Sequence, residues 1–341
     1  MEPQYRRGSK RVRAFARSAC VKARGCSRLL QRVVTDFAAD VPFAKAMDKL
    51  VEHYGVVLGE STIRQITLHH AQAVHARSQG FPQGLPDAAP AQQTFVTQTD
   101  GTMVPTVRTT QGSGDRRKGK SVQWEEARVS LVHAHGSTTL VYAATLSGDV
   151  DTAGRQLRAC AKRAGLTKGH HVHGVGDGAP WIANQMRRFG SQGSYLLDFY
   201  HVSEYLGAAA KAIELQPQAA QAWLHTQQHR LGSQQPEAVL AALQPHLESE
   251  QTDDQQAPVR QCYRYLSQRL QQLDYQSALR QGLPIGSGEI ESAHRYIMHK
   301  RLKLPGTWWL AANADHMLAL RVTRANNEWA SYWATDYRYA A

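Results

Sequence analysis

The chain has 341 residues, of which 42% are hydrophobic, so it can fill the core of one large domain or of two to three small ones. No apolar run approaches the ~20 residues that a membrane-spanning helix needs. We expect no secretory signal, because no continuous apolar segment follows the basic N-terminus. The four scattered cysteines form no Cys-x-x-Cys pair suited to zinc. The formal net charge of +12 indicates a polyanionic partner, because neutralising phosphates is the main affinity term for nucleic acid.

Few, unpaired cysteines fit a reducing compartment, so we expect a cytoplasmic protein with no membrane partner. The first 26 residues are rich in Lys and Arg and poor in large apolar side chains. We expect a basic arm here, which either contacts phosphates or remains a disordered tail. A segment rich in Pro, Gly and Gln at residues 83–93 is the expected linker, and residues 27–82 are expected to be helical.

The helical segment has the order of a helix-turn-helix domain. Gly55 and Gly59 bracket a short turn, and Ser61 is the expected N-cap of a polar third helix. In a helix-turn-helix the first residues of this last helix contact bases in the major groove, which assigns DNA contacts to Arg64 and Gln65. The alternative is a small helical bundle that packs on the neighbouring domain.

Strand-like sequence follows the linker. The three runs cover residues 94–104, 123–134 and 138–146. Gly136-Ser137 is a hairpin signal between the last two. The loop before the second run is glycine-rich and basic, and it contains Arg116, Arg117 and Lys118. These side chains would contact DNA phosphates, or alternatively form a solvated hairpin tip.

The next elements alternate between helix and strand. We expect a helix over residues 151–164, a strand over 171–176, a helix over 180–189 and a strand over 194–199. Three antiparallel strands followed by helix, strand, helix and strand are the order of a ribonuclease-H-like α/β sheet. In that sheet the first strand is central and the fourth lies beside it, which would bring Asp100 and Asp177 together.

The last part of the chain is expected to be helical. Residues 202–281 are rich in Ala, Gln and Leu without strand-like alternation, so we expect an all-α insertion into the α/β core. A glycine-rich turn then opens a helix over residues 289–301. The expected boundaries are a basic arm (1–26), a helix-turn-helix-like DNA-binding domain (27–82), a linker (83–93), the first part of the core (94–201), the insertion (202–281), the last part of the core (282–330) and a tail (331–341).

Three acidic points are the candidates for chemistry. Asp100 and Asp177 each precede a glycine at a strand end, where α/β sheets bind ligands. The third acid is Glu289 or Glu291; these are about 200° apart around a helix, so both cannot point at one site, and geometry alone does not choose. Converging carboxylates can hold two Mg2+ ions, with Mn2+ as a substitute, that stabilise the attacking and leaving oxygens of phosphoryl transfer.

Other polar and aromatic residues accompany the acids. Asp198 and His201 would orient a ligand or contact the scissile phosphate, or else cap the following helix. DNA contacts are also expected from residues near the last acidic helix, which are Lys300, Arg301, Lys303 and Trp308. The cations would bind phosphates. The tryptophan would stack on unpaired bases, although core packing is the alternative for either Trp308 or Trp309.

Four motifs occur in a fixed order. They are Thr99-Asp-Gly-Thr102, Gly176-Asp-Gly-Ala-Pro-Trp-Ile182, Leu197-Asp-Phe-Tyr-His201 and Gly286-Ser-Gly-Glu-Ile-Glu-Ser-Ala-His-Arg295. Together with the Arg-Leu-Lys-Leu-Pro-Gly-Thr-Trp-Trp segment that follows, they make residues 27–330 resemble the DDE transposases of bacterial insertion sequences. The resemblance is to the Kra-type insertion-sequence family, a relative of the mutator-like transposases.

The resemblance implies a ribonuclease-H-like core with a helical insertion, and it places the third acid at Glu291. It also implies that Asp198 and His201 are the Asp-x-x-His pair of mutator-like enzymes. The expected partners are double-stranded DNA, as terminal inverted repeats and target, and further copies of the chain in a homodimer or larger complex. The expected location is the bacterial cytoplasm, at the nucleoid. The alternatives are a ribonuclease-H-like nuclease or resolvase without strand transfer, and an inactive DNA-binding regulator derived from a transposase.

Overall fold

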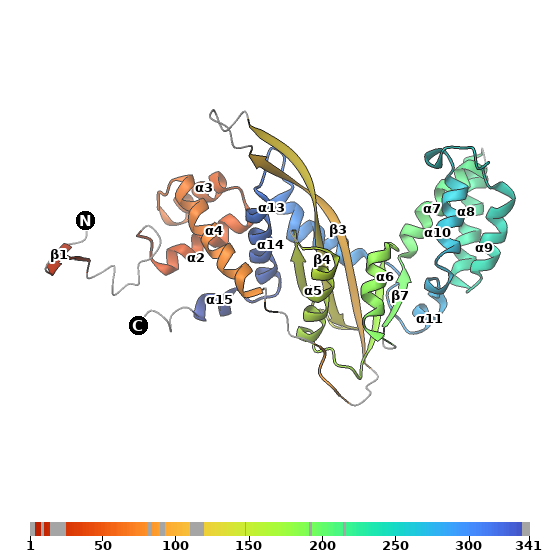
Figure 1. Ribbon diagram of the computed structural model, residues 1–341, viewed down its shortest axis with the longest axis horizontal. Coiled ribbons are helices and arrows are strands. Elements are labelled where there is room, and N and C mark those ends of the chain that lie inside the picture. Colours follow the sequence, from red (N-terminus) through yellow and green to blue (C-terminus); the bar gives the residue numbers. More distant parts are fainter. Residues whose placement is uncertain are drawn as a thin grey trace.

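The computed structural model describes residues 4–7, 10–13, 25–78, 80, 84–88, 93–109, 119–146, 148–190, 193–213 and 216–335. Its main parts lie in a row along the long axis (Figure 1). N-terminal helices lie at one end, a β-sheet covered by helices lies in the middle, and a helical bundle lies at the other end. No helix within these ranges is long and apolar enough to cross a membrane.

The central sheet is mixed, with its strands in the order β5, β4, β3, β6, β7. The strands are β3 (Thr94–Thr109), β4 (Lys120–Ala134), β5 (Val141–Thr145), β6 (His171–Gly176) and β7 (Gly193–Leu197). The first three pair antiparallel, whereas β6 runs parallel to β3 and β7. The prediction that the first strand is central, with the fourth beside it, is therefore confirmed. A separate ribbon of β1 (Gln4–Arg7) and β2 (Lys10–Arg13) lies in the predicted basic arm.

β3 and β4 form a hairpin that extends beyond the rest of the sheet (Figure 1). Pairing continues to Thr109 opposite Lys120, further than the sequence pattern predicts. The pattern is broken at Pro105, but the nitrogen of this residue faces away from β4. Two residues later, on the same side, Val107 donates its N–H to the carbonyl oxygen of Trp309 (2.8 Å). The proline therefore costs no hydrogen bond between β3 and β4.

Helices cover both faces of the sheet. One face carries α5 (Val150–Arg163) and α6 (Pro180–Arg187), both of which were predicted as helices. The other carries α12 (Gly288–Ala293), α13 (Lys300–Leu302) and α14 (Ala311–Ala325). The core on this second face includes Val104, Val129, Leu131, Ile290, Ile297, Met317 and Leu318. These apolar side chains anchor the last acidic helix on β3 and β4.

The helix predicted over residues 289–301 is not one continuous α-helix. Between α12 and α13 lies a π-helical segment, η5 (His294–His299). Arg321 of α14 donates from Nε to the carbonyl oxygen of Ile297 (2.6 Å) and from its guanidinium to that of Tyr296. These bonds satisfy carbonyl groups in the π-helical turn. Because the donor lies on α14, the periodicity of residues 289–301 alone did not reveal this turn.

The N-terminal helices follow the predicted order. They are α2 (Arg28–Asp40), α3 (Phe43–Tyr54) and α4 (Glu60–Ser78). Gly55 ends α3 with a φ of 61°. The Gly59 carbonyl accepts the N–H groups of Thr62 (2.9 Å) and Ile63 (3.1 Å), so α4 begins earlier than expected. Ser61 therefore lies inside the helix, and its prediction as the N-cap is wrong.

The N-terminal helices pack directly on the C-terminal ones. On α4, His70 Nδ1 lies 2.7 Å from the Tyr332 hydroxyl, and His70 Nε2 lies 2.9 Å from Gln31 Oε1. Tyr332 and Trp333 are buried in α15 (Trp329–Thr335). Two residues of the segment expected to begin a tail, Tyr332 and Trp333, thus belong to the core. These contacts agree with the alternative expectation, in which the N-terminal helices form a small bundle that packs on the neighbouring domain.

The predicted insertion forms a bundle of its own (Figure 1). Its helices are α7 (Phe199–Ile213), α8 (Pro217–Gly232), α9 (Pro236–Leu243), α10 (Pro258–Ser267) and α11 (Tyr275–Arg280). The short 3-10 turns are η2 (Gln244–His246), η3 (Asp254–Gln256) and η4 (Leu270–Gln272). The bundle buries its own apolar cluster, which also includes Leu196 and Leu197 of β7. This shared cluster attaches the bundle to the edge of the sheet.

Candidate active site

Asp100 and Asp177 lie at the same level of the sheet. The parallel pairing of β3 and β6 ends with Gln98 opposite Val175, and each aspartate follows two residues later. β6 then stops, and Gly178, with a φ of 82°, turns the chain toward α6. The register therefore brings the two aspartates to neighbouring positions, as the topology predicts, and the charge of Asp177 acts on the Asp100 carboxyl group.

Asp100 is surrounded by other carboxylates. Its pKa is raised to about 6, mainly because the carboxyl group is buried. The N–H of Gly101 donates a 2.7 Å hydrogen bond to Asp100 Oδ1, which opposes the shift. The charges of Asp177, Glu126 and Glu291 raise the pKa further. We refer to these four acids as the acidic cluster; they come from β3, the end of β6, β4 and α12.

Glu126 is the member of the acidic cluster that sequence reasoning missed. It pairs with Met103 across the hairpin, and its side chain crosses Gly101, where an added Cβ would collide with it. Its carboxylate also pairs with Arg128, whose guanidinium donates to the Gly148 carbonyl (2.7 Å). The glycine after the first aspartate was the available signal, because a Cβ at this position would displace the glutamate side chain from its place.

The two glutamates of α12 point in different directions. Glu289 Oε2 accepts a hydrogen bond from Gln98 Nε2 (3.2 Å) and lies 3.0 Å from His133 Nε2. This contact is the main reason that the pKa of His133 is raised. Glu291 is exposed, and its carboxylate makes no hydrogen bond or ion pair with the described part of the chain. Its charge acts on Asp100, so the geometry favours Glu291 as the third acid.

Two buried side chains, Gln98 and Asp198, fix the start of α12. Gln98 Oε1 accepts the N–H of Ile290 at 2.9 Å. Asp198 Oδ2 accepts the N–H of Ser287 at 2.7 Å and also the hydroxyl of the same serine. Because Gln98 lies on β3 and Asp198 follows β7, the sheet determines where Glu291 is placed.

Asp198 and His201, predicted as a functional pair, are related through the backbone. Asp198 Oδ1 accepts the N–H groups of Tyr200 (2.7 Å) and His201 (3.1 Å), so Asp198 caps α7, as the alternative expected. The His201 ring lies against the Tyr205 ring, with Nδ1 3.5 Å from Glu204 Oε2. The structure therefore places this imidazole on the insertion helices rather than at the Asp198 carboxylate.

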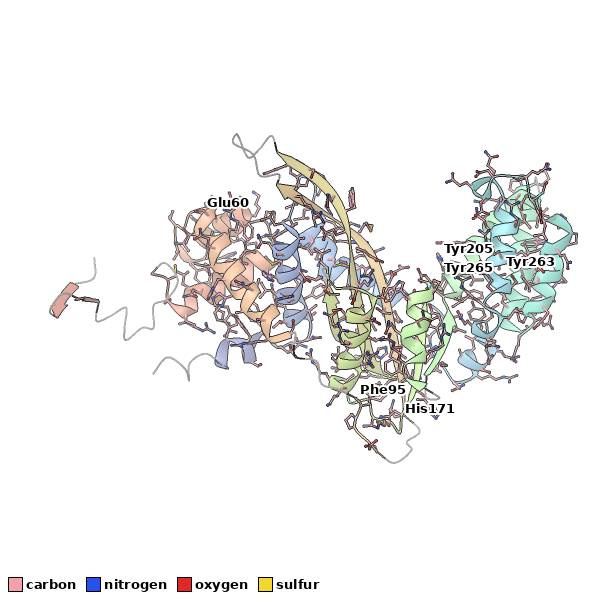
Figure 2. All side chains as sticks on the ribbon, in the orientation of Figure 1. Glu60, Phe95, His171, Tyr205, Tyr263 and Tyr265 are labelled. Carbon is pink, nitrogen blue, oxygen red and sulfur yellow. The ribbon has the colours of Figure 1, made fainter. Side chains whose placement is uncertain are left out.

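The turn that carries Asp177 is held from the insertion. The Tyr265 hydroxyl donates to the carbonyl oxygen of Asp177 (2.6 Å), and Arg269 Nε donates to that of Gly178 (3.1 Å). On the other side, the Tyr195 hydroxyl accepts the N–H of Gly178 (3.0 Å). Figure 2 shows Tyr265 at the end of the bundle that faces the sheet. Sequence reasoning missed these contacts because they join segments far apart along the chain.

Two basic side chains border the acidic cluster. His294 Nδ1 lies 3.7 Å from Asp100 Oδ2, and burial lowers the pKa of His294 to about 4, so the ring is neutral at pH 7. Lys303 Nζ donates to Thr102 Oγ1 (3.4 Å), which lies just beyond Asp100 on β3. Lys303, which the sequence analysis predicted to contact phosphate, thus contacts a side chain two residues beyond Asp100 on β3.

The other residues assigned to DNA lie in different settings. Those exposed on the surface are Arg64, Gln65, Lys300 and Trp308. The basic residues of the hairpin loop, Arg116, Arg117 and Lys118, lie outside the described residues. For the exposed residues and for those of the hairpin loop, the assignment to DNA therefore stays a prediction.

Arg301 requires a correction. Its side chain is only 1% exposed, and its guanidinium lies between the rings of Phe43 and Trp309, 4.7 Å from each ring centre. Arg301 Nε donates to the carbonyl oxygen of Ala38 (2.9 Å). The residue therefore joins α2 and α3 to the core, and it is not on the surface where a DNA phosphate would bind.

The acidic cluster suits a hard divalent cation by its donor chemistry. Carboxylate oxygens are the ligands that Mg2+ prefers, and a bound cation would offset the repulsion that raises the pKa of Asp100. However, the described residues contain no group of three or more His, Cys, Asp or Glu side chains already arranged to hold a metal. Asp100, Asp177 and Glu291 would therefore have to draw closer to share an ion.

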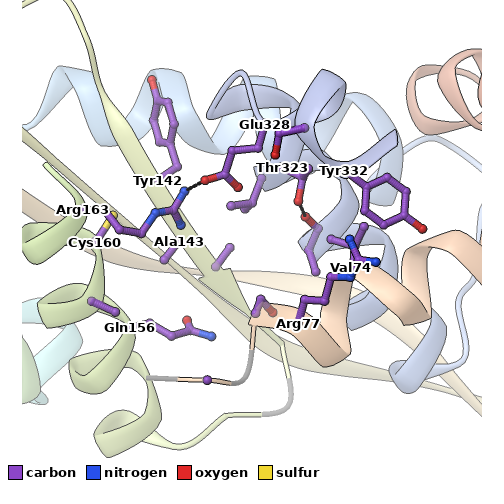
Figure 3. A pocket seen from close by; sticks show the side chains of 17 residues that line it. Val74, Arg77, Tyr142, Ala143, Gln156, Cys160, Arg163, Thr323, Glu328 and Tyr332 are labelled. Atoms are coloured by element: carbon purple, nitrogen blue, oxygen red, sulfur yellow. Dashed lines mark hydrogen bonds and ion pairs between the residues drawn. The ribbon is translucent and has the colours of Figure 1, made fainter. Parts of the chain in front are cut away.

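Two cavities lie away from the acidic cluster. One, of about 440 Å³, lies between α4, α5, β5 and α14 and is lined by the Arg163–Glu328 ion pair (Figure 3). The other, of about 740 Å³, is lined by parts of β6, β7 and α11. Neither includes a member of the acidic cluster, so these cavities do not enclose the candidate chemistry.

Comparison with models of protein families finds a match over part of the chain. No curated protein matches the chain. Residues 165–330 match the model of an uncharacterised protein family, UPF0236. The chain is thus similar to this family over a segment that carries Asp177, Asp198 and Glu291, whereas Asp100 lies before it.

Proposed function

We propose that this chain is a DDE transposase of an insertion sequence, a polynucleotidyl transferase that cleaves DNA strands and joins them to target DNA. The observation that carries the proposal is that Asp177 and Glu291, which come from two other elements, lie near enough to Asp100 for their charges to act on its carboxyl group. The strand order, with the first strand central and the fourth beside it, supports a ribonuclease-H-like core around these acids. The family match adds no information on activity.

In this proposal each acid is positioned by a different part of the fold. Divalent cations held by the three carboxylates, Mg2+ or Mn2+, would activate the attacking water or 3′-hydroxyl and stabilise the leaving oxygen. Asp177 is presented by a turn that the insertion holds, and Glu291 by a helix that Asp198 holds. The neutral His294 imidazole lies beside Asp100 and can exchange a hydrogen bond there without adding a positive charge.

The proposed partner is double-stranded DNA, both as terminal inverted repeats and as target. The net charge of +12 supports a polyanion, and Arg64 and Gln65 are exposed on α4, the last helix of the helix-turn-helix order. Because α4 packs on α14 and α15, DNA bound there would keep a fixed relation to the acidic cluster. We propose that two or more copies assemble on DNA, at the nucleoid of a bacterial cytoplasm.

A second candidate is a DNA-binding regulator derived from a transposase. It is favoured by one observation, the lack of a preformed metal-binding group among the described residues. Such a protein would use α2, α3 and α4 to bind DNA and would not cleave it. A nuclease or resolvase would instead use the same acids without joining strands.

A strand-transfer assay separates these functions. The purified full-length chain is mixed with labelled DNA that carries the sequences flanking its gene, a plasmid target, and Mg2+, Mn2+ or Ca2+. The proposal predicts joined products with Mg2+ or Mn2+. Cleavage without joining would identify a nuclease, and binding without chemistry in any metal would identify the regulator.

A further inference from the structure

The β3–β4 hairpin and the segment beside it carry large apolar side chains that are open to solvent. Their exposed fractions range from 44% to 60%. They are Met103, Val122, Trp124, Trp308 and Leu310. Exposed apolar side chains that gather on one surface mark an interaction site more often than scattered ones do.

Three of these side chains share one face of the hairpin. Residues that pair directly in an antiparallel ladder point to the same side, and Trp124 pairs with Pro105. Side chains alternate along each strand, so Val122 lies on the same face as Trp124, and Met103 on the same face as Pro105. The hairpin therefore has one continuous apolar side beyond the end of β6.

The segment around Trp309 widens this face by one strand. Trp309 pairs with Thr106 of β3, and both residues are buried. By alternation, Trp308 points the opposite way, to the face that carries Trp124 and Pro105. The register places these three residues in a row across neighbouring strands, so the backbones at Trp124 and Trp308 are roughly 10 Å apart, twice the spacing between strands. We call the exposed side chains around this row the tryptophan face.

Charges near the tryptophan face favour an anionic occupant. Arg108 and Lys120, toward the end of the hairpin, are exposed and make no hydrogen bond or ion pair with the part of the chain that the structure describes. The nearby acids are engaged, since Glu125 accepts a hydrogen bond from a β3 hydroxyl (3.1 Å) and Glu126 pairs with Arg128. Among the described charged side chains toward the end of the hairpin, those without a hydrogen bond or ion pair are therefore positive.

We propose that the tryptophan face binds unpaired nucleotides of a DNA strand, with bases stacked on Trp124 and Trp308. Flat indoles beside a positive charge are the elements of single-strand binding. In a duplex the base faces are already stacked on each other, so they are available to an indole only where the strand is unpaired. Two copies of the chain docked by this face would bring Lys120 of one copy toward Lys120 of the other, because Lys120 shares the face of Trp124, and like-charge repulsion opposes this.

The position of the tryptophan face gives this binding a role in the proposed reaction. Met103 follows Asp100 by three residues on β3, which corresponds to about 10 Å along the strand. An unpaired strand held on the face would therefore approach the acidic cluster from the side of Glu126, which pairs with Met103, whereas Asp100 points to the opposite face of β3. This role rests on the proposed function, but binding of unpaired nucleotides can be measured without any cleavage.

The test compares two DNAs of equal duplex length, one blunt and one with an unpaired extension, by fluorescence anisotropy of a dye on the DNA. The full-length chain is used in Ca2+, so that binding is observed apart from chemistry. We expect the wild type to bind the extended DNA more tightly. Trp124→Ala and Trp308→Ala should each weaken binding to the extended DNA by about 10-fold, with binding to blunt DNA unchanged.

Matched variants separate stacking from loss of fold. Trp124→Phe and Trp308→Phe keep an aromatic ring and should retain most of the preference, and Leu279→Ala, an exposed apolar residue on α11, should leave both affinities unchanged. Equal binding of the two DNAs by the wild type, or an unchanged preference in both alanine variants, would overturn the proposal. A loss of self-association in the alanine variants with no change in DNA preference would show an interface between copies instead. Failure of strand transfer alone would overturn only the proposed function.

Discussion

The hydroxyl of Tyr265 donates a 2.6 Å hydrogen bond to the backbone carbonyl oxygen of Asp177. The Tyr265 ring stacks on that of Tyr205, with ring centres 4.3 Å apart, so α10 and α7 support it together. Figure 2 shows both rings at the end of the insertion that faces the sheet. The insertion is therefore part of the support of the candidate active site, because it fixes the turn that presents one of its acids.

Tyr265→Phe should weaken metal-dependent cleavage without unfolding the chain. The substitution removes the hydrogen bond to the Asp177 carbonyl and keeps the stacked ring. We expect cleavage at a given Mn2+ concentration to fall by about 10 to 100-fold, the effect usual for residues that orient metal ligands. Single-turnover cleavage measured against Mn2+ concentration should show a higher metal requirement. Tyr263→Phe, on the same helix, is the control, and an equal effect of both changes would contradict this role.

Asp198→Asn should lower stability and activity together. Asp198 accepts hydrogen bonds from Ser287 on one oxygen and caps α7 with the other, so the amide leaves buried donors without an acceptor. We expect a loss of about 1–3 kcal/mol in the free energy of unfolding, measured by urea denaturation. Ser287→Ala keeps its own backbone N–H bond and should cost less. Complete loss of cleavage in Asp198→Asn at unchanged stability would instead indicate that Asp198 contacts the reacting groups.

The stability of the metal-free chain should depend on pH through Asp100. Its pKa rises from 3.8 to about 6 on folding, mainly by burial. Between these values the folded state binds more protons than the unfolded state, so the Asp100 contribution to stability decreases as the pH rises from about 4 to 6. Thermal denaturation in EDTA should show this decrease in the wild type and a smaller one in Asp100→Asn. The same slope in both proteins would contradict the shift.

The contact between His70 and Tyr332 should stabilise the joined helical domains. Tyr332→Phe removes the hydroxyl that lies 2.7 Å from His70 Nδ1 in a buried setting. We expect a loss of about 1 kcal/mol or more in the free energy of unfolding, because a buried ring nitrogen loses its partner. Tyr54→Phe, on an exposed ring of α3, is the matched control for denaturation experiments. Equal stability of the two variants would show that α15 is not held by this bond.

The sequence was informative where the fold follows from the order of elements. The strand pattern was sufficient to place Asp100 beside Asp177, because a parallel fourth strand next to the first leaves few other arrangements. Likewise, the helical spacing showed that Glu289 and Glu291 diverge. Choosing between them required tertiary contacts. Glu289 contacts Gln98 and His133, which are far from it along the chain, so no local sequence pattern indicates these contacts.

Other features depend on contacts that local patterns do not contain. Arg301 follows an acidic helix in a basic stretch, which is typical of a phosphate-binding residue. Its burial depends on Phe43, which comes from a helix near the other end of the chain, and on Trp309. Tyr265 lies in a segment with the composition of ordinary helices. Its hydrogen bond to the Asp177 carbonyl oxygen could be recognised only from the packing of the bundle against that turn.

The central claim is that Asp100, Asp177 and Glu291 act on one phosphodiester. The most direct measurement is single-turnover cleavage and joining in Mn2+ by Asp100→Asn, Asp177→Asn and Glu291→Gln, with Glu289→Gln as the matched control on the same helix. The account predicts that each of the three loses activity by about 100-fold or more, as expected for metal ligands, while the control keeps most of it. Full activity in any of the three, or an equal loss in Glu289→Gln, would contradict it.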